Sequence, residues 1–150
     1  VVKQIGDKLG GDGHTRLGFG VLATVAVIRE HLGDWVGAGE AHGQAAAGTL
    51  VVRRILDGSV LEAVESSGDH EDRSFYRFEP EQGGFTVLHM LPGATFREHP
   101  VEFTGEGLVW VGPPTEPSVE WVFGSDTLRC DVRWPGDDLP EVRMHWTRRA

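Results

Sequence analysis

Apolar and polar residues alternate along most of the chain from Gly33 onward, in short runs separated by turn residues. Alternation with a period of two is typical of a strand with one buried face, and turn signals about every ten residues are typical of a β-sandwich or a β-barrel. The pattern predicts ten strands. They lie near 34–42, 47–56, 60–67, 73–79, 85–91, 94–104, 108–112, 118–123, 127–134 and 141–149. The sixth is expected to bend at Pro100, because proline is found at bends and sheet edges.

Short turns join these runs. The pair Asp57-Gly58 between two apolar runs is a strong signal for a tight hairpin, and Pro92-Gly93 fits the two central positions of a β-turn. Strands joined in order by short turns form a meander, and a long meander removes its two exposed edges by closing on itself. The sequence therefore predicts an all-β fold, namely a single closed antiparallel up-and-down β-barrel of about ten strands.

The segment before the strands has a different pattern. Residues 17–28 are apolar and are followed by Arg29-Glu30-His31, which indicates one N-terminal helix over about 17–32 that ends near Gly33. The apolar run is too short to cross a bilayer, which takes about 20 residues. Residues 1–16 are expected to form a flexible tail, so that 17–150 makes a single barrel domain.

Composition and charge narrow the function classes. The chain has 150 residues, which fits one domain, and a formal net charge of −9. Nucleic acids and anionic membranes attract clustered Lys and Arg, so this charge argues against both as partners. The single cysteine, Cys130, cannot form an internal disulfide, which favours a cytoplasmic location. The sequence leaves a homodimer open.

The alternation assigns side chains to the two faces of the barrel wall. In the last strand Met144 and Trp146 share the apolar face, and His145 lies on the opposite face. The ninth strand places Cys130 and Trp134 inside by the same argument. The inner-face residues expected to contact a ligand are Tyr76, Phe78, Phe85, His89, Trp110, Trp121, Phe123, Met144 and Trp146.

The first strand begins with the run Gly33-Asp34-Trp35-Val36-Gly37-Ala38-Gly39, of the form G-x-W-x-G-x-G. This run resembles the opening of the nitrobindin-like haem-binding β-barrels, and its G-x-W part is similar to that of the lipocalin and fatty-acid-binding barrels of the calycin type. In lipocalin-type barrels a late arginine lies against the early tryptophan, so the resemblance implies that Arg148 contacts Trp35 and closes the barrel floor. A guanidinium is attracted to the face of an indole, which makes this contact physically reasonable.

The resemblance to nitrobindin also implies a haem group whose iron is bound by a histidine near the C-terminus. His145 is the nearest positional match and is therefore the candidate metal ligand. The alternation of the last strand places His145 outside, together with Arg143 and Thr147. The seven histidines of the chain otherwise follow no known metal-ligand spacing.

His89 is the strongest polar candidate for the barrel interior. It and Tyr76, on the neighbouring strand, form a candidate catalytic acid–base pair. The simpler interpretation is a core histidine that is hydrogen-bonded to Tyr76 or to the backbone. The charged run 69–73 is interpreted as a solvent-exposed hairpin tip.

Three functional hypotheses follow from the expected barrel. Barrels of about eight strands can pack solid, whereas wider ones hold a ligand or a plug, so ten strands favour an internal cavity. The first hypothesis is a protein that binds a small apolar molecule in this cavity. The second is a nitrobindin-like haem protein with His145 or His89 on the iron. The third is a barrel enzyme, an isomerase or a cyclase, that uses His89 and Tyr76. The sequence favours the first.

Overall fold

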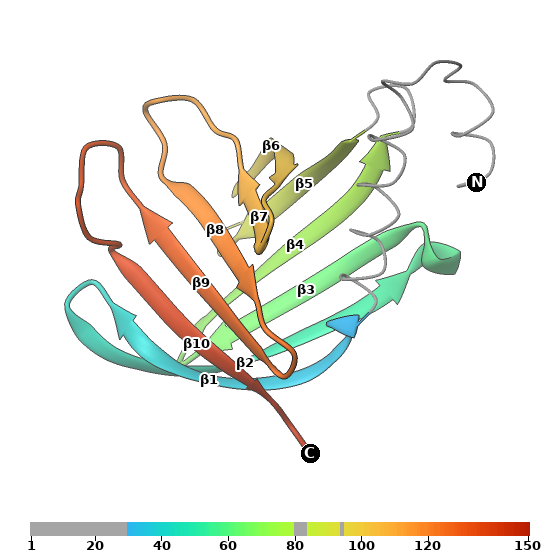
Figure 1. Ribbon diagram of the computed structural model, residues 1–150, viewed down its shortest axis with the longest axis horizontal. Coiled ribbons are helices and arrows are strands. Elements are labelled where there is room, and N and C mark those ends of the chain that lie inside the picture. The colour runs from blue at the N-terminus through green and yellow to red at the C-terminus, as the bar shows by residue number, and fades with distance from the viewer. Residues whose placement is uncertain (1–29, 80–83, 94) are drawn as a thin grey trace.

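The computed structural model describes residues 30–79, 84–93 and 95–150. In this part of the chain ten antiparallel strands form one closed barrel in which each strand lies beside its neighbours in sequence (Figure 1). The strands are β1 (Gly33–Ala41), β2 (Gln44–Ile55), β3 (Val60–Ser67), β4 (His70–Glu79), β5 (Gly84–Leu91), β6 (Thr95–Phe103), β7 (Gly107–Trp110), β8 (Ser118–Phe123), β9 (Thr127–Arg133) and β10 (Val142–Arg148). A short 3-10 turn, Leu56–Gly58, joins β2 to β3.

The predicted single up-and-down barrel of ten strands is confirmed. The predicted tail, and all but the last residues of the helix predicted over 17–32, lie outside the described residues.

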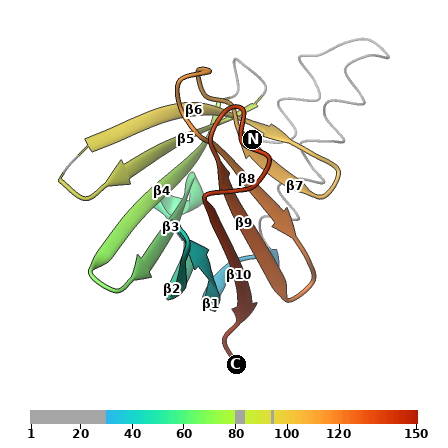
Figure 2. The same cartoon turned by 90° about the vertical axis from the view of Figure 1, so that its left-hand side faces the viewer.

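The barrel closes where the last strand pairs with the first. β10 pairs with β1 in an antiparallel register that runs from Trp35 opposite Arg148 to Ala41 opposite Val142. Figure 2 shows β10 between β1 and β9. Because both ends of the meander are used in this pairing, neither β1 nor β10 leaves an unpaired edge.

The wall is less regular around Pro100. β6 runs through Pro100 as one strand, as predicted, and pairs with β5 from Thr95 to Val101. Its pairing with β7 covers only its last part, because β7 has four residues. Beyond β7 the chain continues as a loop, and the amide of Val111 donates a hydrogen bond to the carbonyl of Pro100 at 2.8 Å. The β7–β8 loop therefore takes the place of a strand beside the first half of β6.

The two largest fully buried side chains among the described residues are indoles. The side chains of Trp35 and Trp146 are 1% and 0% exposed. Trp146 lies directly on the backbone of Gly37, the residue opposite it on β1. A Cβ atom at residue 37 would lie 2.2 Å from a ring carbon of Trp146. The absence of a side chain at residue 37 is what allows the large indole of Trp146 to fit inside the barrel.

At one end of the barrel Arg148 contacts both Trp35 and the segment that precedes β1. Its guanidinium lies over the Trp35 ring, with Cζ 4.4 Å from the ring centroid. The same guanidinium donates to the carbonyls of Leu32, at 2.7 Å, and of Glu30. The Trp35 indole N–H donates to the carbonyl of His31 at 3.2 Å. These contacts hold residues 30–32 across this end of the barrel.

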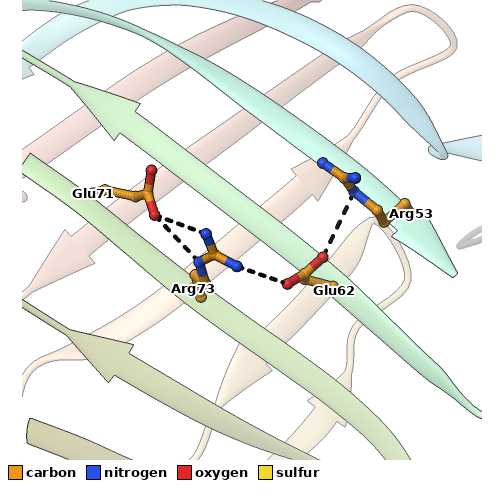
Figure 3. A network of polar contacts seen from close by, with 4 residues as sticks. All are labelled: Arg53, Glu62, Glu71 and Arg73. Carbon is orange, nitrogen blue, oxygen red and sulfur yellow. Dashed lines mark hydrogen bonds and ion pairs between the residues drawn. The ribbon is translucent and has the colours of Figure 1, made fainter. Parts of the chain in front are cut away.

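The outer face carries ion pairs between neighbouring strands. Glu62 on β3 lies between Arg53 on β2 and Arg73 on β4, and Arg73 also contacts Glu71 (Figure 3). Glu62 is only 9% exposed although it lies outside the barrel, because the two arginines cover it. Its two ion pairs offset the unfavourable desolvation of its carboxylate.

One inner-face assignment was wrong. Trp134 is 41% exposed, and its indole N–H donates to Glu141. The reason is that β9 ends at Arg133, so the alternation no longer applies at the next residue, where the chain turns at Pro135 and Gly136.

The contact between Gly37 and Trp146 predicts that a side chain at residue 37 destabilises the fold. Gly37→Ala should lower the free energy of unfolding by about 1–3 kcal/mol, the usual cost of overpacking a core. Gly105→Ala is the control, since a Cβ atom at that residue meets nothing within 4 Å. Urea denaturation of both variants measures the difference. Equal stabilities would show that the Gly37 site relaxes around an added methyl group.

Candidate functional site

Two cavities formed by the described residues lie inside the barrel, and they have no lining residue in common. The larger has a volume of about 450 Å³ and lies at the end with the β1–β2, β3–β4 and β5–β6 turns. The smaller has a volume of about 60 Å³, is lined mostly by apolar side chains, and lies toward the end where Arg148 contacts Trp35. Between them Trp110, which lines the larger cavity, donates from its indole N–H to the hydroxyl of Tyr76, which lines the smaller, at 3.2 Å.

One side of the larger cavity is apolar. It is formed by inner-face residues of β2 and of β7–β10. These residues are Ala46, Trp110, Val119, Cys130, Val132 and Met144. Burial raises the pKa of the Cys130 thiol well above its usual value, so Cys130 is a neutral, apolar part of this surface at neutral pH. This apolar side can therefore contact the body of a ligand without polar partners.

Trp110 connects this apolar surface to the polar part of the cavity. The ring of His89 meets the Trp110 indole edge to face at a centroid distance of 5.0 Å. The ring of His99 is stacked with the same indole at 6.3 Å. Both histidines line the cavity, so Trp110 lies between the apolar side and two imidazoles.

Asp72 is the residue around which the polar part is organised. Its carboxylate lies 3.1 Å from Nε2 of His70 and 3.4 Å from Nε2 of His89. The expectation of a solvent-exposed hairpin tip over 69–73 was wrong for this residue, since β4 already begins at His70. Asp72 therefore occupies an inner-face position two residues before Ser74, and its side chain is only 17% exposed.

Glu65 lies on β3 directly opposite Asp72 on β4. Its side chain lines the larger cavity and makes no hydrogen bond or ion pair with any described residue. Burial, together with the negative charge of Asp72, raises the pKa of Glu65 to about 8. At neutral pH this carboxyl group is therefore mostly protonated. It is a partly buried polar group inside the barrel that has no hydrogen-bond or ion-pair partner among the described residues.

The remaining charged residues around the cavity are paired with one another. His99 lies 3.3 Å from the Glu116 carboxylate of the β7–β8 loop, and Arg97 lies 4.0 Å from the same carboxylate. His42 lies 2.9 Å from Glu141 at the rim. The His42 side chain is 70% exposed, which places it at the mouth of the cavity.

The other residues singled out in the sequence are divided among four places. His89, Trp110 and Met144 line the larger cavity, whereas Tyr76, Trp121 and Phe123 line the smaller one. The rings of Phe78 and Phe85 contact each other in a tilted arrangement at a centroid distance of 5.2 Å, and Phe85 also contacts Phe103. Trp146 is part of the buried core.

His145 lies outside the barrel, apart from these residues. It lies on the outer face of β10, opposite Ala38 and Arg129, and is exposed to solvent. Its side chain is therefore directed away from both cavities. Among residues 30–79, 84–93 and 95–150, no three His, Cys, Asp or Glu side chains are grouped as a metal site would require.

No known protein family matches the sequence, and no curated protein is significantly similar to it. A closed ten-stranded antiparallel barrel is consistent with a barrel of the calycin type. Within the part of the chain that the structure describes, no helix has the length and apolar character needed to cross a membrane.

The environment of Glu65 predicts a pH-dependent stability. A carboxyl group whose pKa is raised in the folded state stabilises the fold below its unfolded pKa, near 4.5, and that stability is lost as the pH rises toward 8. Glu65→Gln removes this titration. Relative to the wild type, the variant should gain more than about 1.4 kcal/mol between pH 5 and pH 8.5, the equivalent of one pKa unit.

Urea unfolding at several pH values tests this expectation. Glu62→Gln is the matched control, since Glu62 lies on the same strand, faces outward and is paired with two arginines. The control should show no such gain over the wild type. A Glu65→Gln effect of constant size from pH 5 to pH 8.5 would contradict the assignment of a neutral Glu65.

Proposed function

We propose that this protein binds a small, largely apolar molecule in the larger cavity of the barrel. The observation that carries the proposal is a cavity of about 450 Å³ that combines an apolar side, formed by β2 and β7–β10, with a few polar groups on β3–β6. Sites for small molecules in proteins are typically concave, mostly apolar and about 300–1,000 Å³ in volume. The proposal also agrees with the calycin-type resemblance of the G-x-W run at Gly33–Trp35.

The cavity suggests how such a ligand would be oriented. An apolar ring or chain would lie against Trp110 and Met144 on the apolar side. Each 40 Å² of apolar ligand surface that leaves water contributes about 1 kcal/mol to binding. A polar group on the ligand would lie near Asp72 and His89, where hydrogen-bonding partners are present.

The two other hypotheses have less support. His145 does not fit the role of iron ligand for a haem inside the barrel, because its side chain is exposed on the outer face. His89 lines the cavity, but it is held beside the Asp72 carboxylate. Tyr76 and His89 line different cavities, so a substrate in one of them would not meet both as an acid–base pair.

Filling the cavity should abolish binding. Ala46 lines the larger cavity, whereas its neighbour Ala47 is exposed on the outer face of the same strand. Ala46→Phe should weaken the binding of an apolar fluorescent dye, such as an anilinonaphthalene, at least tenfold. Ala47→Phe adds the same volume outside and should leave the affinity within about twofold of the wild type, since surface substitutions typically change free energies by less than 0.5 kcal/mol.

Dye fluorescence measured against protein concentration gives these affinities, and circular dichroism verifies that both variants fold. Equal affinities for the two variants would place the dye outside the larger cavity and would contradict the proposal. Adding haemin to the wild type separates the haem alternative. A Soret band that is lost in His89→Ala would favour a haem protein instead.

A further inference from the structure

We propose that the ligand carries a protonated amine and that this cation is held between the carboxyl groups of Glu65 and Asp72. This inference rests on the proposed function, because it names the chemical class of the molecule that occupies the larger cavity. It makes Glu65 and Asp72 the residues that determine specificity.

The geometry brings the two carboxyl groups together. Glu65 and Asp72 are directly opposite each other on antiparallel neighbours, and both line the cavity. Side chains opposite each other on neighbouring strands have Cβ atoms about 5 Å apart, so one ammonium group can contact both carboxyl groups. Two ionised carboxylates in this arrangement would repel each other unless a cation lay between them.

None of the described residues around Glu65 offers a positive charge that would balance its carboxylate. From β4 it faces Asp72, and His70 lies nearby at the start of that strand. From β2, the inner-face residues nearest to it in the register are Gly48 and Leu50, neither of which can ionise. Of the histidines, His70 and His89 are already paired with Asp72. The described residues therefore place no cation beside Glu65 that would balance its ionised form.

The groups farther away do not supply that charge. Tyr76 and Cys130 interact electrostatically with Glu65, but burial raises the pKa of both, so both stay neutral. His99 and Arg97 are paired with Glu116 on the other side of the cavity. An anionic ligand would be repelled by the Asp72 carboxylate, and no unpaired cation among the described residues would offset this repulsion. A cationic ligand would find two acceptors.

Binding of a cation is expected to be coupled to proton release. The Glu65 carboxyl group is mostly protonated at neutral pH because its pKa is raised to about 8, by burial and by Asp72. An ammonium group beside it would favour the ionised form and lower this pKa. At pH 7 a bound amine would therefore displace about one proton from the protein.

The apolar part of the cavity limits the amine further. The indole of Trp110 lies against His89, and His89 contacts Asp72. A ligand whose aromatic ring lies on Trp110 therefore needs only a short linker between this ring and an amine that reaches Glu65 and Asp72. An aromatic amine with one or two carbons between the ring and the nitrogen fits this arrangement.

A matched set of three naphthalenes tests the inference by isothermal titration calorimetry. The probes are 2-(1-naphthyl)ethylamine, 2-(1-naphthyl)ethanol and 1-naphthylacetic acid, which share one ring and differ in the charge of the polar group. At pH 7 the amine should bind at least tenfold more tightly than the alcohol, and the acid more weakly than either. Titrations in two buffers of different ionisation enthalpy should show release of about one proton with the amine and none with the alcohol.

The pH dependence has a defined sign. The amine remains protonated below a pKa of about 10, as lysine does. Its affinity should therefore rise between pH 6 and pH 8, as Glu65 no longer has to lose a proton on binding, and should level off above pH 8. The affinity for the alcohol should stay constant over the same range.

Glu65→Gln should abolish the tenfold preference for the amine and the proton release, while the affinity for the alcohol stays within about twofold. Glu62→Gln, which changes the same residue type on the outer face, should behave like the wild type. If the alcohol or the acid binds the wild type as tightly as the amine, the cavity binds apolar molecules but the amine inference is overturned. If Glu65→Gln keeps the preference, it is likewise overturned. If none of the three probes binds, the proposed function itself fails.

Discussion

The pairing of β1 with β10 is the constraint on which the rest of this structure depends. It converts a meander of ten strands into a ring, and a ring of this size encloses more space than its inner side chains fill. The pairing is reinforced at one end by Arg148, which lies over Trp35 and binds the carbonyls of the chain that precedes β1. The cavities exist because the ring is closed and one end of it is covered.

The bulkiest buried side chains lie toward one end of the barrel. Trp35 and Trp146 are packed at the level where Gly37 leaves room for an indole, and they fill the bore toward the covered end. Toward the other end the inner face changes to alanine, valine and ionisable side chains, and the space stays open. Glu65 is part of that change. Placing a carboxyl group inside a barrel is unfavourable for folding, so its position is best explained by a function of the cavity.

Much of the fold could be predicted because the alternation of side chains and the turn signals are local. The ten strands, the continuous sixth strand through Pro100 and the inward positions of Met144 and His89 all follow from a period of two. The first and last residues of each strand are harder to predict from the sequence, since they depend on partner strands that are far away in the sequence. Two errors came from this: Trp134 lies just beyond the end of β9, and Asp72 lies inside because β4 begins earlier than its apolar residues indicate.

The site itself was predicted only in part for the same reason. The sequence shows that Glu62 and Glu65 face opposite ways, and hence that one of them is inside. It does not show which, because that depends on the register with β4 and on the arginines that cover Glu62. Tyr76 and His89 are on adjacent strands, as expected, but Trp110 from across the barrel lies between the two cavities that they line. Contacts across a barrel cannot be derived from neighbouring strands alone.

The central claim is that the larger cavity is open and accepts an apolar molecule. A crystal structure of the protein with 1-bromonaphthalene tests it most directly, because the anomalous signal of bromine locates the probe independently of the side chains. The account predicts a bromine peak inside the barrel beside Trp110 and Met144. A peak found only on the outer surface, with Trp110 or Met144 filling the space, would contradict it.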